Sequence, residues 1–160
     1  MTAKPRILFL CTANCCRSQM AEAILKHIAP EKFDALSAGS RPAGYVHPLV
    51  AEALEPMGIP VEDQHSKRWD EFIDQPIDLV ITVCDAAAAE VCPAWPDRPT
   101  TVHWSLPDPV MFPGTDEDRR AAARRVAERL MLKLRRFAAL DWEHHNALEL
   151  RDELESIAQF

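Results

Sequence analysis

The chain has 160 residues, 48% of them hydrophobic and 27% charged, which is enough for one domain with its own core and too few for two. Its formal net charge of −7 repels nucleic acid and anionic membranes, so neither is an expected partner. The longest early apolar stretch, Ile7 to Leu10, is too short for a signal peptide or a membrane span, and we expect a cytoplasmic protein.

The first part of the chain predicts two strands that alternate with two helices. The apolar run from Arg6 to Leu10 is typical of a buried strand, and helical spacing of apolar residues then runs from near Ser18 to Pro30. A second strand is predicted from Phe33 to Ala38, and a second helix from about Pro48 to Met57. The residues between the first strand and the first helix therefore form a loop.

The rest of the chain continues the alternation. Apolar runs predict strands from Leu79 to Val83 and from Thr101 to Trp104. A long helix is predicted from about Asp116 to Phe137, with an acidic start and a basic end that suit the helix dipole. A last helix is predicted from about Glu143 to Ala158.

This order of elements predicts an α/β fold, in which a four-stranded parallel sheet is flanked by helices in three layers. We expect residues 1–140 to form this single domain and residues 141–160 to form a C-terminal helical extension packed on it. Ligands of such folds bind at the carboxyl ends of the strands. The loop after the first strand, Cys84 and the loop with Asp108 should meet at that edge.

The loop from Cys11 to Ser18 has the pattern C-x5-R-S, which suits an oxyanion site with its own nucleophile. A loop of this length can turn its N–H groups inward, and Arg17 can bind two oxygens of a tetrahedral anion. The same positive field should lower the pKa of Cys11, since a thiolate is the reactive form. The alternative is a small buried cysteine and a surface arginine that are spaced this way by chance. The predicted substrate-binding residues are Thr12, Ala13, Asn14, Cys15, Cys16, Arg17 and Ser18.

This loop resembles the phosphate loop of the low-molecular-weight tyrosine phosphatases and of their arsenate-reductase relatives. Members commonly carry Gly at the position of Ala13 and Ser at the position of Cys15. Ala13 is therefore a poor residue for any backbone conformation with positive φ. Ser18 is retained, and its hydroxyl is a candidate donor to the sulfur of Cys11.

Asp108, which precedes Pro109, matches the position of the family's general acid. A carboxyl group beside the anion could protonate the leaving oxygen, and the alternative is a turn aspartate before proline. Tyrosine phosphatases of this fold usually place aromatic residues just after this acid, where they help to grip phosphotyrosine. Here Val110, Met111 and Phe112 follow, which weighs against a phosphotyrosine substrate.

The chain has 5 cysteines, and an odd number in a reducing compartment argues against structural disulfides. Cys84 follows a predicted strand, and Cys92 precedes a proline. This pair resembles the resolving cysteines of disulfide-relay arsenate reductases, and the resemblance runs from about Lys4 to Phe137. Taken singly, Cys84 is also consistent with a core cysteine, and Cys92 with a turn residue.

The resemblance implies an arsenate reductase with no bound cofactor and no metal site. Cys11 would attack arsenate, of which phosphate and sulfate are mimics, and Cys84 would then attack the Cys11 sulfur and release arsenite. Cys92 would next attack Cys84 and leave a disulfide for an external thiol reductant. That reductant would be a thioredoxin-like protein, or glutathione with glutaredoxin acting on the Cys11–Cys84 disulfide. We expect a monomer.

Geometry sets a condition on this relay. The residues from Asp85 to Glu90 favour a helix, and eight residues of helix would separate Cys84 from Cys92 by about 12 Å. A disulfide needs Cα atoms within roughly 7 Å of each other. We therefore expect this helix to unwind on oxidation and to present the disulfide to a thioredoxin-like partner.

Some relatives bind potassium beside the anion loop, through side chains like those of Asn14, Glu22 and Ser37. Their acidic ligand near Ser66 corresponds to Lys67 in this chain. We expect the Lys67 ammonium to take the place of the cation and to pair with Glu22, so that potassium changes the activity little.

Two rival functions follow from the same residues. A phosphatase that hydrolyses phosphate monoesters needs the loop and Asp108 but not the two later thiols. A thiol-based metalloid or zinc sensor is disfavoured because no C-x2-C pair exists and no DNA-reading surface is evident. His103 precedes Trp104 on a predicted strand, and burial is the simplest account of it.

Overall fold

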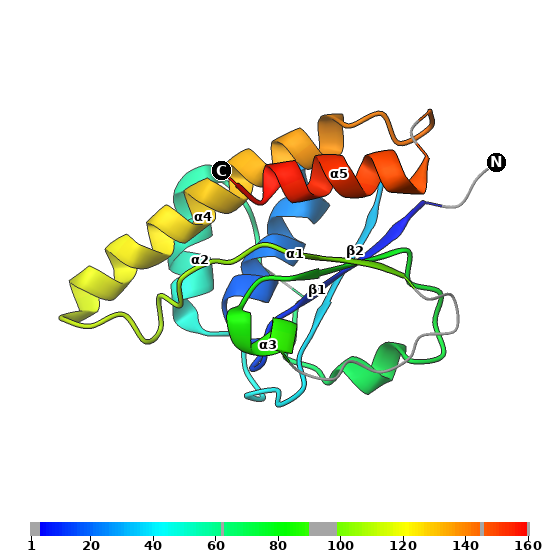
Figure 1. The fold of residues 1–160 in the computed structure, drawn as a ribbon. Helices are drawn as coiled ribbons and strands as arrows, with labels where there is room; N and C mark the ends of the chain where they lie inside the picture. Colours follow the sequence, from blue (N-terminus) through cyan, green and yellow to red (C-terminus); the bar gives the residue numbers. More distant parts are fainter. Residues whose placement is uncertain (1–3, 62, 90–98, 145, 160) are drawn as a thin grey trace.

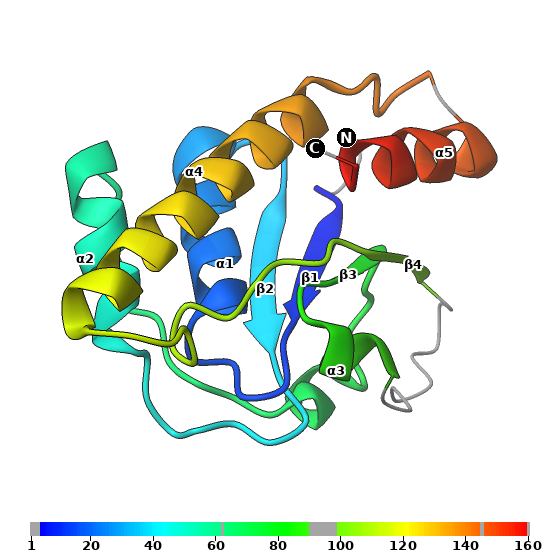
Figure 2. The same ribbon diagram turned by 60° about the vertical axis from the view of Figure 1, so that its left-hand side comes forward.

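The sheet has four parallel strands in the order β2-β1-β3-β4 (Figure 2). The computed structural model describes residues 4–61, 63–89, 99–144 and 146–159. Its strands are β1 (Arg6–Leu10), β2 (Asp34–Ala38), β3 (Leu79–Thr82) and β4 (Thr100–His103). Each strand lies within one residue of its predicted bounds, and the predicted parallel sheet flanked by helices is confirmed.

Helices connect and cover the strands (Figure 1). None of them, within the described residues, is long and apolar enough to cross a membrane. The α-helices are α1 (Arg17–Ile28), α2 (Pro48–Leu54), α3 (Asp85–Ala89), α4 (Asp116–Ala139) and α5 (Ala147–Ile157), and the 3-10 helices are η1 (Glu55–Met57) and η2 (Trp69–Phe72).

The second predicted helix is divided into α2 and η1. Pro56 has no N–H with which to continue the α-helical hydrogen bonds, so the last turn tightens into a 3-10 helix. Gly58 then closes the segment in the left-handed region, with a φ of 70°. The predicted end at Met57 is therefore correct, although the helix type changes before it.

The two faces of the sheet carry separate cores, because successive side chains of a strand point to opposite faces. Ile7 and Phe9 of β1 belong to the larger core, which is covered by α1, α2, α4 and α5. Leu8 and Leu10 belong to a smaller core that is closed by Phe72 of η2. Figure 2 shows α1, α2 and α4 gathered on the same side of the strands. The second face is thus covered by a short 3-10 helix.

The C-terminal helix begins later than predicted, at Ala147 instead of Glu143. Asn146 caps it, since its side chain accepts a hydrogen bond from the Glu149 N–H at 2.9 Å. The Glu149 carboxylate in turn accepts from the Asn146 N–H at 3.3 Å. This reciprocal pair is a capping box, which defines the first turn more strongly than the acidic residue at 143 does.

The C-terminal helix packs on α4 and β4, and a buried lysine holds its end. Lys133 of α4 is only 1% exposed, and its Nζ donates to the carbonyls of Ile157 at 3.0 Å and Ala158 at 3.1 Å. These carbonyls lie at the end of α5, where the helix supplies no donors of its own. Trp104 Nε1, next to β4, donates to the Leu154 carbonyl at 3.2 Å.

The carboxyl ends of the strands bring three distant segments to one edge of the sheet. β1 leads into the Cys11 loop, β3 leads to Cys84 and α3, and β4 leads to the segment that carries Asp108. In Figure 2 the arrowheads of β1 and β2 point toward this edge, and α3 lies beyond it.

Candidate active site

The loop after β1 turns its carbonyl groups outward, onto the neighbouring segment. The carbonyls of Thr12, Ala13 and Cys15 accept backbone hydrogen bonds at 2.9, 2.9 and 2.8 Å from residues 41, 43 and 47. The Asn14 carbonyl accepts from the Gln19 side chain at 3.1 Å. Because consecutive carbonyls are occupied on the outside, the N–H groups of the same loop face its interior.

Several of these N–H groups have no partner among the described residues. Within the described part of the chain, none of the backbone N–H groups from Asn14 to Ser18 donates to another residue. Such a row of free N–H groups, which ends in the first turn of α1, is an anion-binding nest. The loop thus has the free donors that an oxyanion site requires.

The residue of the loop that adopts the left-handed backbone conformation is Asn14, and Ala13 has a negative φ. Asn14 has a φ of 46°, a conformation that asparagine tolerates better than most residues. Its buried side chain donates to Ser18 Oγ at 2.8 Å and accepts from the Lys67 N–H at 2.9 Å. The concern about Ala13 is thus removed, while donation from Ser18 to Cys11 stays a prediction.

The glycine that ends β2 is required by the loop. A Cβ at Gly39 would lie 2.4 Å from the carbonyl oxygens of both Cys11 and Thr12, which is closer than any real contact. Only glycine lets β2 and the loop approach this closely.

Arg17 and Asp108 lie together at the mouth of the loop. Arg17 Nη1 donates to the Leu106 carbonyl at 3.0 Å, and Arg17 Nη2 is 3.5 Å from Asp108 Oδ2. The remaining donor, Arg17 Nε, is buried and has no hydrogen-bond partner among the described residues. A buried guanidinium N–H without a partner is costly, and an oxyanion held in the nest would satisfy it.

Cys84 meets Cys11 at the floor of the site. Both thiols are buried and free, and they are hydrogen-bonded to each other. The Cys84 sulfur also accepts from the Ala87 N–H at 3.3 Å and lies 3.7 Å from the Thr12 hydroxyl. The hydrogen bond from Cys11, together with those from Thr12 and Ala87, lowers the pKa of Cys84 to about 5.

The pKa of Cys11 is subject to opposing influences, of which the sequence interpretation considered only the positive field of the loop. The hydrogen bond to Cys84, and then burial, raise the pKa of Cys11 well above the usual range of a thiol, although Arg17 acts in the opposite direction. The hydrogen bond between the two sulfurs thus raises the pKa of Cys11 and lowers that of Cys84, to which Thr12 and Ala87 also donate.

The other predicted thiols are placed differently. Burial raises the pKa of Cys16 to about 12, which suits a residue of the loop wall. Cys15 is half-buried, and burial followed by the Asp108 carboxylate raises its pKa. Cys92 lies outside the described residues. No group of three His, Cys, Asp or Glu residues that could hold a metal ion occurs in the described ranges.

A buried ion pair supports the loop from below, as expected for Lys67. Its Nζ is 3.5 Å from Glu22 Oε1, and Glu22 is only 3% exposed. The same carboxylate accepts from Ser37 Oγ at 2.6 Å and pairs with Lys26 Nζ at 2.6 Å. The Glu22 carboxylate is thus paired with two ammonium groups, those of Lys26 and Lys67. The backbone N–H of Lys67 also donates to the Asn14 side chain.

Potassium should therefore have little effect on the activity of this chain. Equal turnover is expected in potassium and sodium chloride at the same ionic strength, because Lys67 already supplies the positive charge. In a Lys67→Ala variant the buried carboxylate loses that partner, and a stimulation by potassium over sodium should appear. Severalfold stimulation of the parent by potassium would contradict the expectation.

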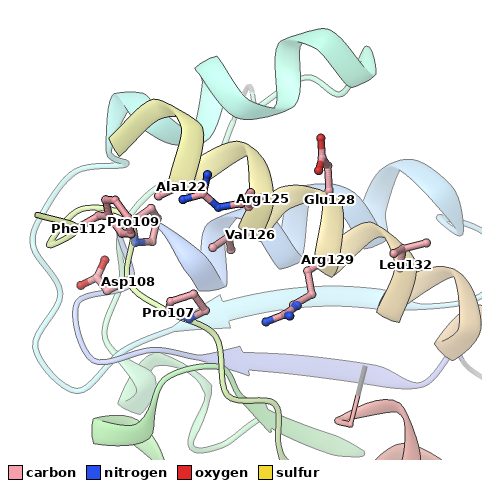
Figure 3. Close-up of a pocket in the computed structure, with 10 residues that line it drawn as sticks. All are labelled: Pro107, Asp108, Pro109, Phe112, Ala122, Arg125, Val126, Glu128, Arg129 and Leu132. Atoms are coloured by element: carbon pink, nitrogen blue, oxygen red, sulfur yellow. The ribbon is translucent and has the colours of Figure 1, made fainter. Parts of the chain in front are cut away.

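A groove lies beside the segment that carries Asp108. It has a volume of about 520 Å³ and is mostly apolar, which suits neither the size nor the charge of a tetrahedral oxyanion. Arg125 lies over the Phe112 ring, 5.6 Å from its centroid. Figure 3 shows the lining residues: Pro107, Asp108, Pro109, Phe112, Ala122, Arg125, Val126, Glu128, Arg129 and Leu132.

One cluster was missed by the sequence interpretation, which explained His103 by burial alone. The His103 side chain is 35% exposed, and its Nε2 is 2.8 Å from Asp85 Oδ1. Ser105 Oγ donates to the same carboxylate oxygen at 2.9 Å. The hydrogen bonds from His103 and then from Ser105 lower the pKa of Asp85. The detectable signal was the position of His103 at the end of the strand next to the one that precedes Cys84.

Comparison with known proteins agrees with this geometry. The sequence profile of the low molecular weight phosphotyrosine protein phosphatase family matches residues 6–146. An arsenate reductase from Halalkalibacterium halodurans is 42% identical over 135 residues, which are 84% of this chain and 96% of that protein.

Solved structures show the same arrangement. An arsenate reductase in a phosphate-binding state superposes with a TM-score of 0.65 at 29% identity, over 82% of this chain and 97% of that one. A thioredoxin-dependent arsenate reductase from Corynebacterium glutamicum superposes with a TM-score of 0.58 at 31% identity, over 84% of this chain and 63% of that one.

Proposed function

We propose that this chain, which belongs to the low molecular weight phosphotyrosine protein phosphatase family, is an arsenate reductase that converts arsenate to arsenite. The observation that carries the proposal is the contact between two free thiols, those of Cys84 and Cys11. Hydrolysis of a phosphate ester needs Cys11, Arg17 and an acid, but it has no use for Cys84. A two-electron reduction needs a second thiolate within reach of the first, and Cys84 has a pKa of about 5 at that position.

In the first step the loop binds arsenate. The free N–H groups and Arg17 Nε hold its oxygens, so that the arsenic atom lies beside the Cys11 sulfur while Cys84 stays next to that sulfur. The Cys11 sulfur forms a bond to arsenic, an arsenic–oxygen bond breaks, and the oxygen leaves as water that carries the former thiol proton. We assign delivery of that proton to Asp108, because its carboxyl group is paired with Arg17 at the mouth of the loop.

In the second step the Cys84 thiolate attacks the Cys11 sulfur. A sulfur–sulfur bond forms, the sulfur–arsenic bond breaks, and its electron pair stays on arsenic. Arsenic is thereby reduced from V to III and leaves as arsenite, while two thiols become the Cys11–Cys84 disulfide. The hydrogen bonds that hold the Cys84 thiolate also aim it at Cys11.

In the third step Cys92 attacks Cys84 and frees Cys11, and an external thiol reductant reduces the remaining disulfide. We propose a thioredoxin-like protein for this role, with glutathione and glutaredoxin as the alternative. The protein is proposed to act as a cytoplasmic monomer and to bind phosphate or sulfate as mimics of arsenate.

Oxidation should melt α3. Its residues form a helix in the reduced structure, and a Cys84–Cys92 disulfide is incompatible with continuous helix between the two cysteines. Amide hydrogen exchange at residues 86–89 is expected to be markedly faster in the oxidised protein than in the reduced one. Unchanged protection in protein shown by mass spectrometry to contain the disulfide would contradict this.

The direct test is arsenate-dependent oxidation of NADPH in the presence of thioredoxin and thioredoxin reductase. Steady turnover by the parent, lost in Cys11→Ser, is expected. No turnover with either thioredoxin or glutathione and glutaredoxin, together with hydrolysis of an aryl phosphate, would instead assign the chain as a phosphatase.

A further inference from the structure

We propose that His103 and Ser105 are positioning residues, which act through Asp85 to hold the first turn of α3 so that the Cys84 sulfur stays opposite Cys11. This inference deepens the proposed function and rests on it for the role of Cys84. Among the described residues, His103, Ser105 and Asp85 make no hydrogen bond to the oxyanion loop, and Asp85 acts on Arg17 of that loop only through its charge.

Three segments are joined by this contact. The His103 ring lies at the end of β4, with Nε2 2.8 Å from Asp85 Oδ1 and Nδ1 2.7 Å from Thr82 Oγ1. A carboxylate can only accept a hydrogen bond, so His103 Nε2 carries a hydrogen and donates a hydrogen bond to Asp85. Ser105 Oγ adds a second donor to the same oxygen at 2.9 Å. The ends of β3 and β4 are thus tied to the first residue of α3.

The hydrogen bond from His103 to Asp85 matters because the position of the Cys84 sulfur depends on the helical turn that begins at Asp85. The Ala87 N–H donates to the Cys84 sulfur at 3.3 Å, and it does so only while residues 85–87 are helical. A helix of five residues is too short to be stable by itself. Contacts with other segments must therefore stabilise α3. Among them, the hydrogen bonds that Asp85 accepts from His103 and Ser105 involve the residue next to Cys84 in the chain.

The position of the Asp85 hydrogen bonds, at the first residue of α3, also suits the proposed order of thiol attacks. α3 must be ordered while Cys84 attacks Cys11, and it must open when Cys92 attacks Cys84. A tie at the first residue of α3 keeps Cys84 in place and leaves the rest of the helix free to unwind. The His103 side chain is partly exposed and the Asp85 side chain is largely exposed. Their hydrogen bond can therefore break without disrupting the core.

The test compares His103→Ala and Ser105→Ala with the parent. A titration of thiolate absorbance gives the first ionisation of the Cys11–Cys84 pair, and Cys11→Ser and Cys84→Ser supply the titration curves of each thiol without the other. Cys11, the titratable group that faces Cys84 from the loop, is unchanged in the two test variants, as is Asp85 on α3. The midpoint is expected to rise by about one pH unit in His103→Ala, and kcat for arsenate to fall about tenfold at a pH below the new midpoint.

The structure supplies a matched control. His144 and Asp141 form a similar exposed pair at 2.8 Å, far from the site, and His144→Ala should change nothing. Hydrolysis of an aryl phosphate, which needs Cys11 but not Cys84, should stay within about twofold of the parent in the His103→Ala, Ser105→Ala and His144→Ala variants. Asp85→Asn keeps an acceptor for both donors and should restore most of what Asp85→Ala loses, even though alanine favours helix more.

An unchanged midpoint in folded His103→Ala and Ser105→Ala would overturn the proposal, as would equal loss of arsenate and aryl phosphate turnover. Failure of the proposed function is distinguishable, since it would appear as absence of arsenate turnover in the parent. The titration is informative about the positioning role in either case, because it requires no substrate.

Discussion

Replacing Cys84 with serine is expected to abolish arsenate reduction while sparing the hydrolysis of a small aryl phosphate. Serine has nearly the same size as the buried cysteine, so the fold should persist. Its hydroxyl cannot attack the Cys11 sulfur, and loss of a nucleophile costs about 10³-fold or more in turnover. The measurement is NADPH-linked arsenate turnover beside aryl phosphate hydrolysis on the same preparation.

Cys92→Ser provides the matched comparison, since it removes the next thiol in the proposed relay. This variant should release about one arsenite per protein and stop with a Cys11–Cys84 disulfide, which mass spectrometry can identify. Cys84→Ser should release none. Sustained turnover by either variant with thioredoxin as the sole reductant would exclude the three-thiol relay in this order.

Replacing Arg17 with lysine is expected to lower kcat/KM for arsenate and for aryl phosphate together. A lysine keeps the charge but loses the planar fork, and it cannot bind the Leu106 carbonyl, Asp108 and the anion at once. Removing a donor from an oxyanion site costs about 10²- to 10³-fold. Steady-state kinetics on both substrates measure the loss.

Arg125→Lys is the control, because this arginine lines the adjacent groove, over the Phe112 ring, and belongs to α4. It should leave both activities within about twofold. If Arg125→Lys and Arg17→Lys reduce activity equally, the anion is bound in the groove and the loop is not the site.

The strands and the anion loop were predictable because their signals are local. A run of apolar residues such as Ile7 to Leu10 must be buried on both faces, and this alone places Cys11 at a strand end. The spacing from Cys11 to Arg17 then determines a loop whose free N–H groups precede a helix. The Lys67–Glu22 pair was also predictable, from one substitution relative to related proteins.

Contacts between distant segments were not predictable in the same way. The field of the loop alone predicts a lowered pKa for Cys11, whereas the donors that lower the pKa of Cys84 come from Cys11 itself, Thr12 and Ala87. Two thiols 73 positions apart in the chain form a hydrogen bond only when β1 and β3 are neighbours. The tie from His103 to Asp85 likewise needs β3 beside β4.

The amino-acid sequence by itself thus determined the order of strands and helices and the loop in which the oxyanion site and its nucleophile are proposed, since each depends on residues close together in the chain. Only the tertiary structure decided which groups donate to the Cys84 sulfur, which residue takes the left-handed conformation and which side chains contact the first residue of α3. These depend on hydrogen-bond donors and acceptors that approach from other segments, and their distances are set by the packing of the whole sheet.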